Sequence, residues 1–67
     1  MKPNEIKAAL ILAEVSQASI AKKLGVSRAA IFYVINGDRP SPRIRAAIAE
    51  AISQPVSEVF PDNQEAA

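Results

Sequence analysis

The sequence predicts one small all-α domain made of five helices. Serine residues stand where helices would begin, glycine residues stand where helices would end, and 67 residues are enough for a single domain. A serine hydroxyl at the start of a helix accepts a hydrogen bond from an unpaired backbone N–H of the first turn. Glycine adopts at low cost the left-handed conformation that often closes a helix. These start and stop signals therefore divide the chain into short helices.

The five helices are expected at residues 4–14, 17–24, 28–36, 41–52 and 56–60. The expected first-turn caps are Asn4, Ser16, Ser27 and Ser41, and the expected stops are Gly25 and Gly37. Pro42 suits the first position of its helix, because its missing N–H would have had no intrahelical partner. Residues 1–62 are expected to form the domain, and residues 63–67 are expected to be a disordered tail.

Residues 31–35 are ambiguous, because Ile-Phe-Tyr-Val-Ile is β-branched or aromatic throughout. The Asn36-Gly37 pair that follows is a favoured hairpin turn. A partner strand, however, would have to include Pro40 and Pro42, which cannot donate ladder hydrogen bonds. A helix instead separates an aliphatic face, Ala30, Ile31, Val34 and Ile35, from a mixed face, Arg28, Ala29, Phe32, Tyr33 and Asn36. The helix is therefore our prediction for this stretch.

Residues 17–36 have the spacing of a helix-turn-helix motif. Ala21 is small where the two helices would cross, and Gly25 follows four residues later, where it permits the turn. Val26 would fill the space under that turn. In this motif the second helix lies in the major groove of DNA, so residues 28–36 are the expected recognition helix.

The composition argues against an enzyme and against metal binding. The chain has no cysteine and no histidine, so it lacks disulfides, thiolate nucleophiles and the usual zinc ligands. Its two glycines do not form a phosphate-binding loop, and its carboxylates show no paired spacing. We therefore expect no catalytic residue, no cofactor and no metal site.

The apolar segments are too short to insert into a membrane. A span would need about 20 consecutive apolar residues, and the sequence contains none. The apolar run at residues 8–13 is short for a signal peptide and is flanked by Glu5 and Glu14. A cytoplasmic protein is expected.

The charges are distributed unevenly along the chain. Residues 22–45 contain six basic side chains and one acidic side chain, whereas residues 46–67 contain four acidic side chains and no basic one. The net charge of the whole chain is only +1. This asymmetry predicts a basic face for a polyanion and an acidic face turned away from it, although two ordinary solvated surfaces remain an alternative.

The motif also resembles a known family through Ser16-Gln17, Ile20-Ala21, Leu24-Gly25-Val26-Ser27, Ile31 and Asn36-Gly37. These residues are similar to the helix-turn-helix of phage repressors of the Cro type and their bacterial relatives. Residues 48–52 resemble the closing helices of that group, and the proline-bounded segment 55–61 is similar to the ending of small Ner-type phage regulators. The resemblance covers most of residues 6–61 and implies a compact five-helix DNA-binding domain.

In this architecture the start of the recognition helix faces base edges. The residues expected to contact bases are Ser27, Arg28, Ala29, Phe32 and Tyr33. Arg28 suits the O6 and N7 atoms of guanine, Ala29 a thymine methyl group, and Phe32 a thymine methyl group or a sugar. The Tyr33 hydroxyl suits a phosphate or a base. Simpler alternatives are that Ala29 only favours the helix and that Phe32 belongs to the core.

The residues expected to contact the DNA backbone are Ser16, Gln17, Asn36, Arg39, Arg43 and Arg45. The family resemblance implies the phosphate contacts of Gln17 and Asn36, whose simpler alternatives are a polar helix start and a helix cap. The arginines follow the recognition helix and could neutralise phosphates. Lys22 and Lys23 are expected to form a solvated face instead.

The sequence thus predicts sequence-specific binding of double-stranded DNA and transcriptional regulation, of the phage or prophage repressor type. A homodimer is expected, because two recognition helices about 34 Å apart read a palindromic operator. Its partner surface would come from Ile11 or Leu12, or from Val56, Val59 and Phe60. The alternative is a protein-interaction module, such as a helical adaptor or an antitoxin, with an exposed aromatic and apolar surface.

Overall fold

The computed structural model describes residues 1–61. Five helices make up this part of the chain: α1 (Pro3–Leu12), α2 (Gln17–Leu24), α3 (Arg28–Ile35), α4 (Pro42–Ala51) and α5 (Val56–Val59). No β-strand occurs within residues 1–61, which confirms the all-α prediction. The expected tail at residues 63–67 lies outside the described residues.

Three of the four expected caps are confirmed at the helix starts. The hydroxyls of Ser16, Ser27 and Ser41 accept hydrogen bonds from backbone N–H groups three residues later, at 3.0, 3.2 and 3.4 Å. The fourth, Asn4, is wrong, because α1 begins one residue earlier at Pro3. There the backbone N–H of Lys2 donates a 2.7 Å hydrogen bond to the Glu5 carboxylate, which replaces the expected cap.

The first four helices all end in the same way. A residue in the left-handed conformation follows each helix, and the N–H groups of this residue and of the next one donate hydrogen bonds to two carbonyls in the last helical turn. The left-handed residues are Glu14 (φ 60°), Gly25 (φ 71°), Gly37 (φ 82°) and Ser53 (φ 56°). After α1, for example, Val15 donates to Leu10 and Glu14 donates to Ile11. The two glycine stops are confirmed. The other two ends shorten α1 and α4 relative to the expected 4–14 and 41–52.

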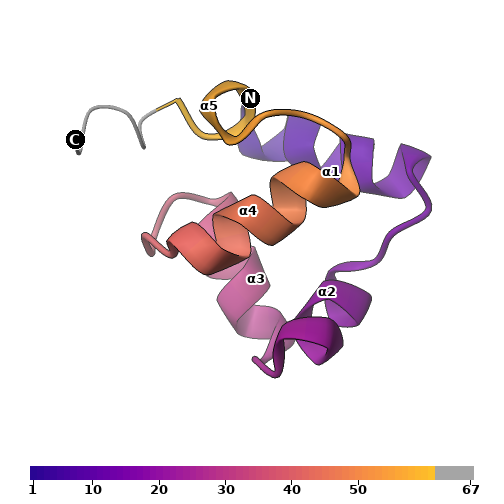
Figure 1. The fold of residues 1–67 in the computed structure, drawn as a ribbon, viewed down its shortest axis with the longest axis vertical. Helices are drawn as coiled ribbons and strands as arrows, with labels where there is room; N and C mark the ends of the chain where they lie inside the picture. Colours follow the sequence, from indigo (N-terminus) through magenta and orange to yellow (C-terminus); the bar gives the residue numbers. More distant parts are fainter. Residues whose placement is uncertain (62–67) are drawn as a thin grey trace.

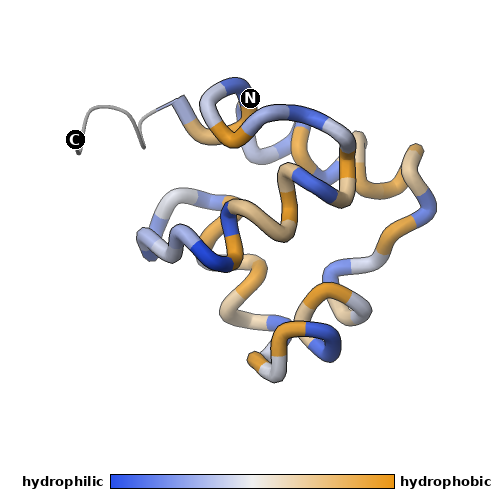
Figure 2. Tube along the Cα trace, viewed as in Figure 1, coloured by the Kyte–Doolittle hydropathy of each residue, from blue (hydrophilic) through white to orange (hydrophobic). Residues whose placement is uncertain are grey.

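The core lies between α1, α2, α3 and α4, with α5 packed against them. Figure 1 shows α1 and α5 at one end of the molecule, α2 at the other, and α3 and α4 between them. In Figure 2, hydrophobic and hydrophilic residues are mixed along α2 and α4, as one-sided packing requires, whereas α3 is largely hydrophobic after its first residue. The largest fully buried side chains are Ile6, Leu10, Ile31, Val34, Ile48 and Val59.

The two faces of α3 are those that its sequence predicts. Ile31, Val34 and Ile35 are buried, whereas Phe32 and Tyr33 keep 44% and 40% of their surface exposed. The alternative in which Phe32 joins the core is therefore wrong. The aliphatic face of α3 packs inward and its aromatic pair is left on the surface.

The short helix α5 packs into the core through Val59, while Ser57 and Glu58 remain exposed. Val59 and Phe60 are 0% and 4% exposed, so the expectation that they form a partner surface is wrong. The amino group of Met1 donates hydrogen bonds to the carbonyls of Glu58 and Val59, at 2.8 and 3.1 Å. These bonds explain why the N-terminus lies beside α5 in Figure 1.

Candidate functional site

Helices α2 and α3 form a helix-turn-helix whose turn is closed by backbone hydrogen bonds. The N–H of Val26 donates to the carbonyl of Ala21 at 2.9 Å, and Gly25 between them has the positive φ that this closure needs. Ala21 is buried at the crossing of the two helices. From α4, Arg43 Nη2 donates a 2.8 Å hydrogen bond to the carbonyl of Leu24, the last residue of α2.

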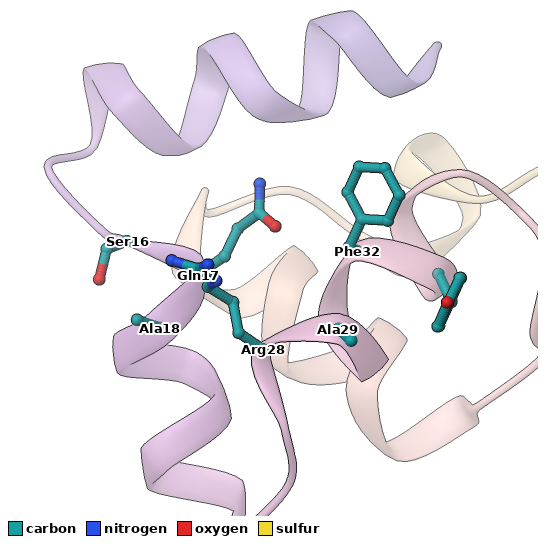
Figure 3. A pocket seen from close by; sticks show the side chains of 7 residues that line it. Ser16, Gln17, Ala18, Arg28, Ala29 and Phe32 are labelled. Carbon is teal, nitrogen blue, oxygen red and sulfur yellow. The ribbon is translucent and has the colours of Figure 1, made fainter.

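The starts of α2 and α3 border an open hollow of about 690 Å³. It is lined by Ser16, Gln17, Ala18, Arg28, Ala29, Phe32 and Tyr33. Figure 3 shows the Arg28 side chain reaching from the start of α3 to the start of α2, while the Phe32 ring points toward α1. The structure thus brings together six side chains that the sequence analysis chose separately. Ala18 was missed, because a small exposed alanine carries no chemical signal.

The two aromatic rings of the hollow lie in a row that ends in a cation on each side. Lys7 Nζ lies 5.0 Å from the centre of the Phe32 ring, and the Arg39 guanidinium carbon lies 5.2 Å from the centre of the Tyr33 ring. The ring centres of Phe32 and Tyr33 are 6.0 Å apart, with an edge-to-face angle of 67°. Both cation–ring contacts are of the attractive kind. We call Lys7, Phe32, Tyr33 and Arg39 the aromatic row.

Lys7 is a member of this row that sequence reasoning missed. It lies on α1, 25 positions away from Phe32 in the sequence, and no pattern along the chain links the two. Its neighbour Ile6 is buried in the core, which fixes α1 beside α3 and leaves Lys7 half-buried over the ring. Only the packing of the two helices reveals the contact.

The remaining candidate residues have different surroundings. Ser27 is exposed and caps α3, whereas Asn36 is half-buried at the C-terminal end of α3. Arg43 is exposed, but one of its nitrogens is engaged by the Leu24 carbonyl. Arg45 is 5% exposed, and its guanidinium carbon lies 5.1 Å from the centre of the Phe60 ring. This burial contradicts the expected phosphate contact of Arg45 and assigns its side chain to the core.

The chemistry of the hollow suits a polyanion that also presents flat, partly apolar groups. Arg28 supplies a forked donor, Gln17 supplies an amide, and Phe32 supplies an apolar surface. Among residues 1–61, no carboxylate lines the hollow. Within residues 1–61, His, Cys, Asp and Glu side chains form no group of three that could hold a metal ion. In the same residues, no helix has both the length and the apolar character needed to cross a membrane.

Comparison with known proteins agrees with this geometry. The sequence profile of a family described as winged helix-turn-helix DNA-binding matches residues 1–66. Neither the curated proteins nor the solved structures contain a match to the chain. Since residues 1–61 contain no strand, the part of the chain that the structure describes has the helix-turn-helix without a β-sheet wing.

Proposed function

The chain belongs to the winged helix-turn-helix DNA-binding family, and from this premise we propose that it is a transcriptional repressor of the phage or prophage type. It would bind a palindromic operator in double-stranded DNA by placing α3 in the major groove. The observation that carries this proposal is the hollow at the starts of α2 and α3. Its lining combines Arg28 with Gln17, Ala29, Phe32 and Tyr33, and no acidic side chain of the described part of the chain belongs to it.

Within this proposal the candidate side chains divide by chemistry. Arg28 would bond the O6 and N7 atoms of a guanine, while Ser27, Ala29, Phe32 and Tyr33 would meet neighbouring base edges. Backbone phosphates would be contacted by Ser16, Gln17, Asn36 and Arg39, whereas Arg43 donates to the Leu24 carbonyl instead. The similarity of residues 16–37 to the motif of Cro-type repressors supports these roles.

We further propose that the protein binds its operator as a homodimer through the end of α1. Ile11 and Leu12 are 75% and 85% exposed, more than any other large hydrophobic side chain of residues 1–61. Ala8 precedes them by three and four positions and is also exposed, so the three share one face of α1. A second copy would cover this apolar face and place two recognition helices on one side of the DNA.

The experiment that tests the proposed function is the selection of bound duplexes from a random DNA library, followed by sequencing. We expect a palindrome whose half-sites are about 10 base pairs apart, centre to centre. The Arg28→Ala variant should lose the preference at one position of each half-site, whereas Lys22→Ala, on an exposed position outside the hollow, should keep it. A folded sample that enriches no sequence would contradict the proposal.

The second candidate function is a protein-interaction module, and the exposure of Ile11 and Leu12 is the observation that favours it. The dependence of binding affinity on salt concentration distinguishes the two candidate functions. Each phosphate contact contributes about −0.9 to the slope of log affinity against log salt concentration, so DNA binding should weaken steeply. Binding through an apolar interface should change little, because it involves few charges.

A further inference from the structure

Phe32 is the least polar part of the hollow on α3. Phe32 is 44% exposed, and Ala29, one helical turn earlier, also lines the hollow. Neither side chain can donate or accept a hydrogen bond. Donors are supplied around them by Gln17 and Arg28. The hollow therefore contains an apolar spot surrounded by polar groups.

Only one group in the major groove matches an apolar spot of this kind. The base edges present oxygen, nitrogen and amino groups, and the single apolar group is the 5-methyl group of thymine. A cytosine amino group or a guanine oxygen pressed against the ring of Phe32 would lose its water without gaining a partner, which is unfavourable. Because the ring cannot form hydrogen bonds, it disfavours polar base groups and favours the thymine methyl group.

Contacts on two sides hold the ring of Phe32. Lys7 Nζ lies 5.0 Å from the ring centre, and Tyr33 meets the ring edge-to-face at 6.0 Å. A half-exposed side chain without such contacts would exchange among rotamers. A ring that is already held loses less freedom when DNA binds, so a small apolar contact contributes more to selectivity.

We propose that Phe32 reads the 5-methyl group of a thymine in the major groove and that Lys7, from α1, is the positioning residue that fixes the Phe32 ring for this contact. The proposal rests on the DNA-binding function proposed above and adds a base preference and a residue outside the helix-turn-helix. Lys7 acts through Phe32, so its removal should change the response to the methyl group and not only the overall affinity.

The first experiment uses the full-length protein and the selected operator. Each thymidine is replaced in turn by deoxyuridine, which removes the methyl group and keeps every hydrogen-bonding atom. At one position per half-site we expect binding to weaken about fourfold, the effect of one methyl group that is no longer buried. Deoxyuridine at thymidines that neither Phe32 nor Ala29 contacts should leave the affinity unchanged. This experiment needs no protein variant, so a folding defect cannot obscure it.

The second experiment repeats the comparison with variants. Phe32→Ala should bind the thymidine and deoxyuridine operators equally. Lys7→Met keeps the side-chain length but removes the cation, so the ratio of the two affinities should fall toward equality. Lys7→Arg restores a cation over the ring and should restore the ratio. Lys22→Met is the matched control, because it removes the same charge from an exposed position that does not line the hollow.

The outcomes separate this inference from the proposed function. A selected operator without thymine, or one in which deoxyuridine costs nothing at any position, overturns the methyl readout while the regulator function stands. An equal deoxyuridine effect in the wild type and in Phe32→Ala overturns the assignment to Phe32. An unchanged ratio in Lys7→Met overturns the role of Lys7. If no duplex is enriched at all, the proposed function fails and this inference fails with it.

Discussion

Arg43 Nη2 donates a 2.8 Å hydrogen bond to the backbone carbonyl of Leu24, and this bond ties α4 to the last residue of α2. The carbonyls at the end of a helix have no partner within the helix, and a guanidinium is a strong donor that also opposes the negative end of the helix dipole. Because Leu24 directly precedes the turn of the helix-turn-helix, the bond supports the angle between α2 and α3. Arg43 therefore has a structural role besides any contact with DNA.

Replacing Arg43 should affect stability more than DNA binding. We expect Arg43→Met to lower the free energy of unfolding by about 1 kcal/mol, because an exposed charge-assisted hydrogen bond is lost. Urea denaturation followed by circular dichroism measures this change. The slope of log affinity against log salt concentration should stay the same. A slope that becomes shallower by about one unit would instead identify Arg43 as a phosphate contact.

Replacing Arg28 should remove specificity at one base pair. The Arg28→Ala variant is expected to lose about 1–3 kcal/mol of discrimination at that position, because it loses a bidentate donor. Arg28 is exposed at the first position of α3, so the variant should fold as the wild type does. Competition binding with operators mutated one base pair at a time measures the loss. A uniform loss at all positions would make Arg28 a phosphate contact and contradict base readout.

At the left-handed positions that end the helices, replacing glycine should lower the stability of the domain, and introducing glycine should raise it. Gly25 has no neighbouring atom within 4 Å of an added Cβ, so Gly25→Ala should cost only the conformational strain, about 1 kcal/mol of unfolding free energy. Ser53→Gly and Glu14→Gly relieve the same strain and should stabilise the domain by about 0.5 kcal/mol each. Thermal melts should separate the two groups, since 1 kcal/mol shifts Tm by about 4–8 °C in a domain of this size. A lower Tm for both Ser53→Gly and Glu14→Gly would contradict this reasoning.

The apolar end of α1 predicts a change in self-association without a change in folding. We expect Ile11→Ser combined with Leu12→Ser to weaken dimerisation roughly tenfold or more, because the face that a partner would cover becomes polar. The melting temperature of the monomer should change little, since both side chains are exposed. Sedimentation equilibrium, with and without operator DNA, measures the dimer.

A core variant provides the comparison for this result. Phe60→Ala should lower the free energy of unfolding by about 3–5 kcal/mol, because Phe60 is 4% exposed and packs in the core. Under conditions in which the Phe60→Ala variant remains folded, the end of α1 should be unaltered. A double serine variant that dimerises as the wild type does would show that another surface joins the two copies.

The sequence by itself determined the features that depend on neighbouring residues. The serine caps, the two glycine stops and the extent of α2 were predicted correctly, because a cap or a left-handed turn forms within about five residues. The aliphatic and aromatic faces of α3 were also predicted, since helical periodicity alone separates Ile31 and Val34 from Phe32 and Tyr33.

Only the tertiary structure decided the features that depend on distant segments. Arg45 looked like its exposed neighbour Arg43, but Phe60, directly after α5, packs against it in the core. Lys7 joined the aromatic row because α1 packs beside α3, a relationship that no local pattern encodes. The left-handed conformation of Glu14 likewise could not be predicted, because no glycine marks the end of that helix. In each case the free energy of packing between elements outweighs the local preference, and packing partners cannot be read from one stretch of chain.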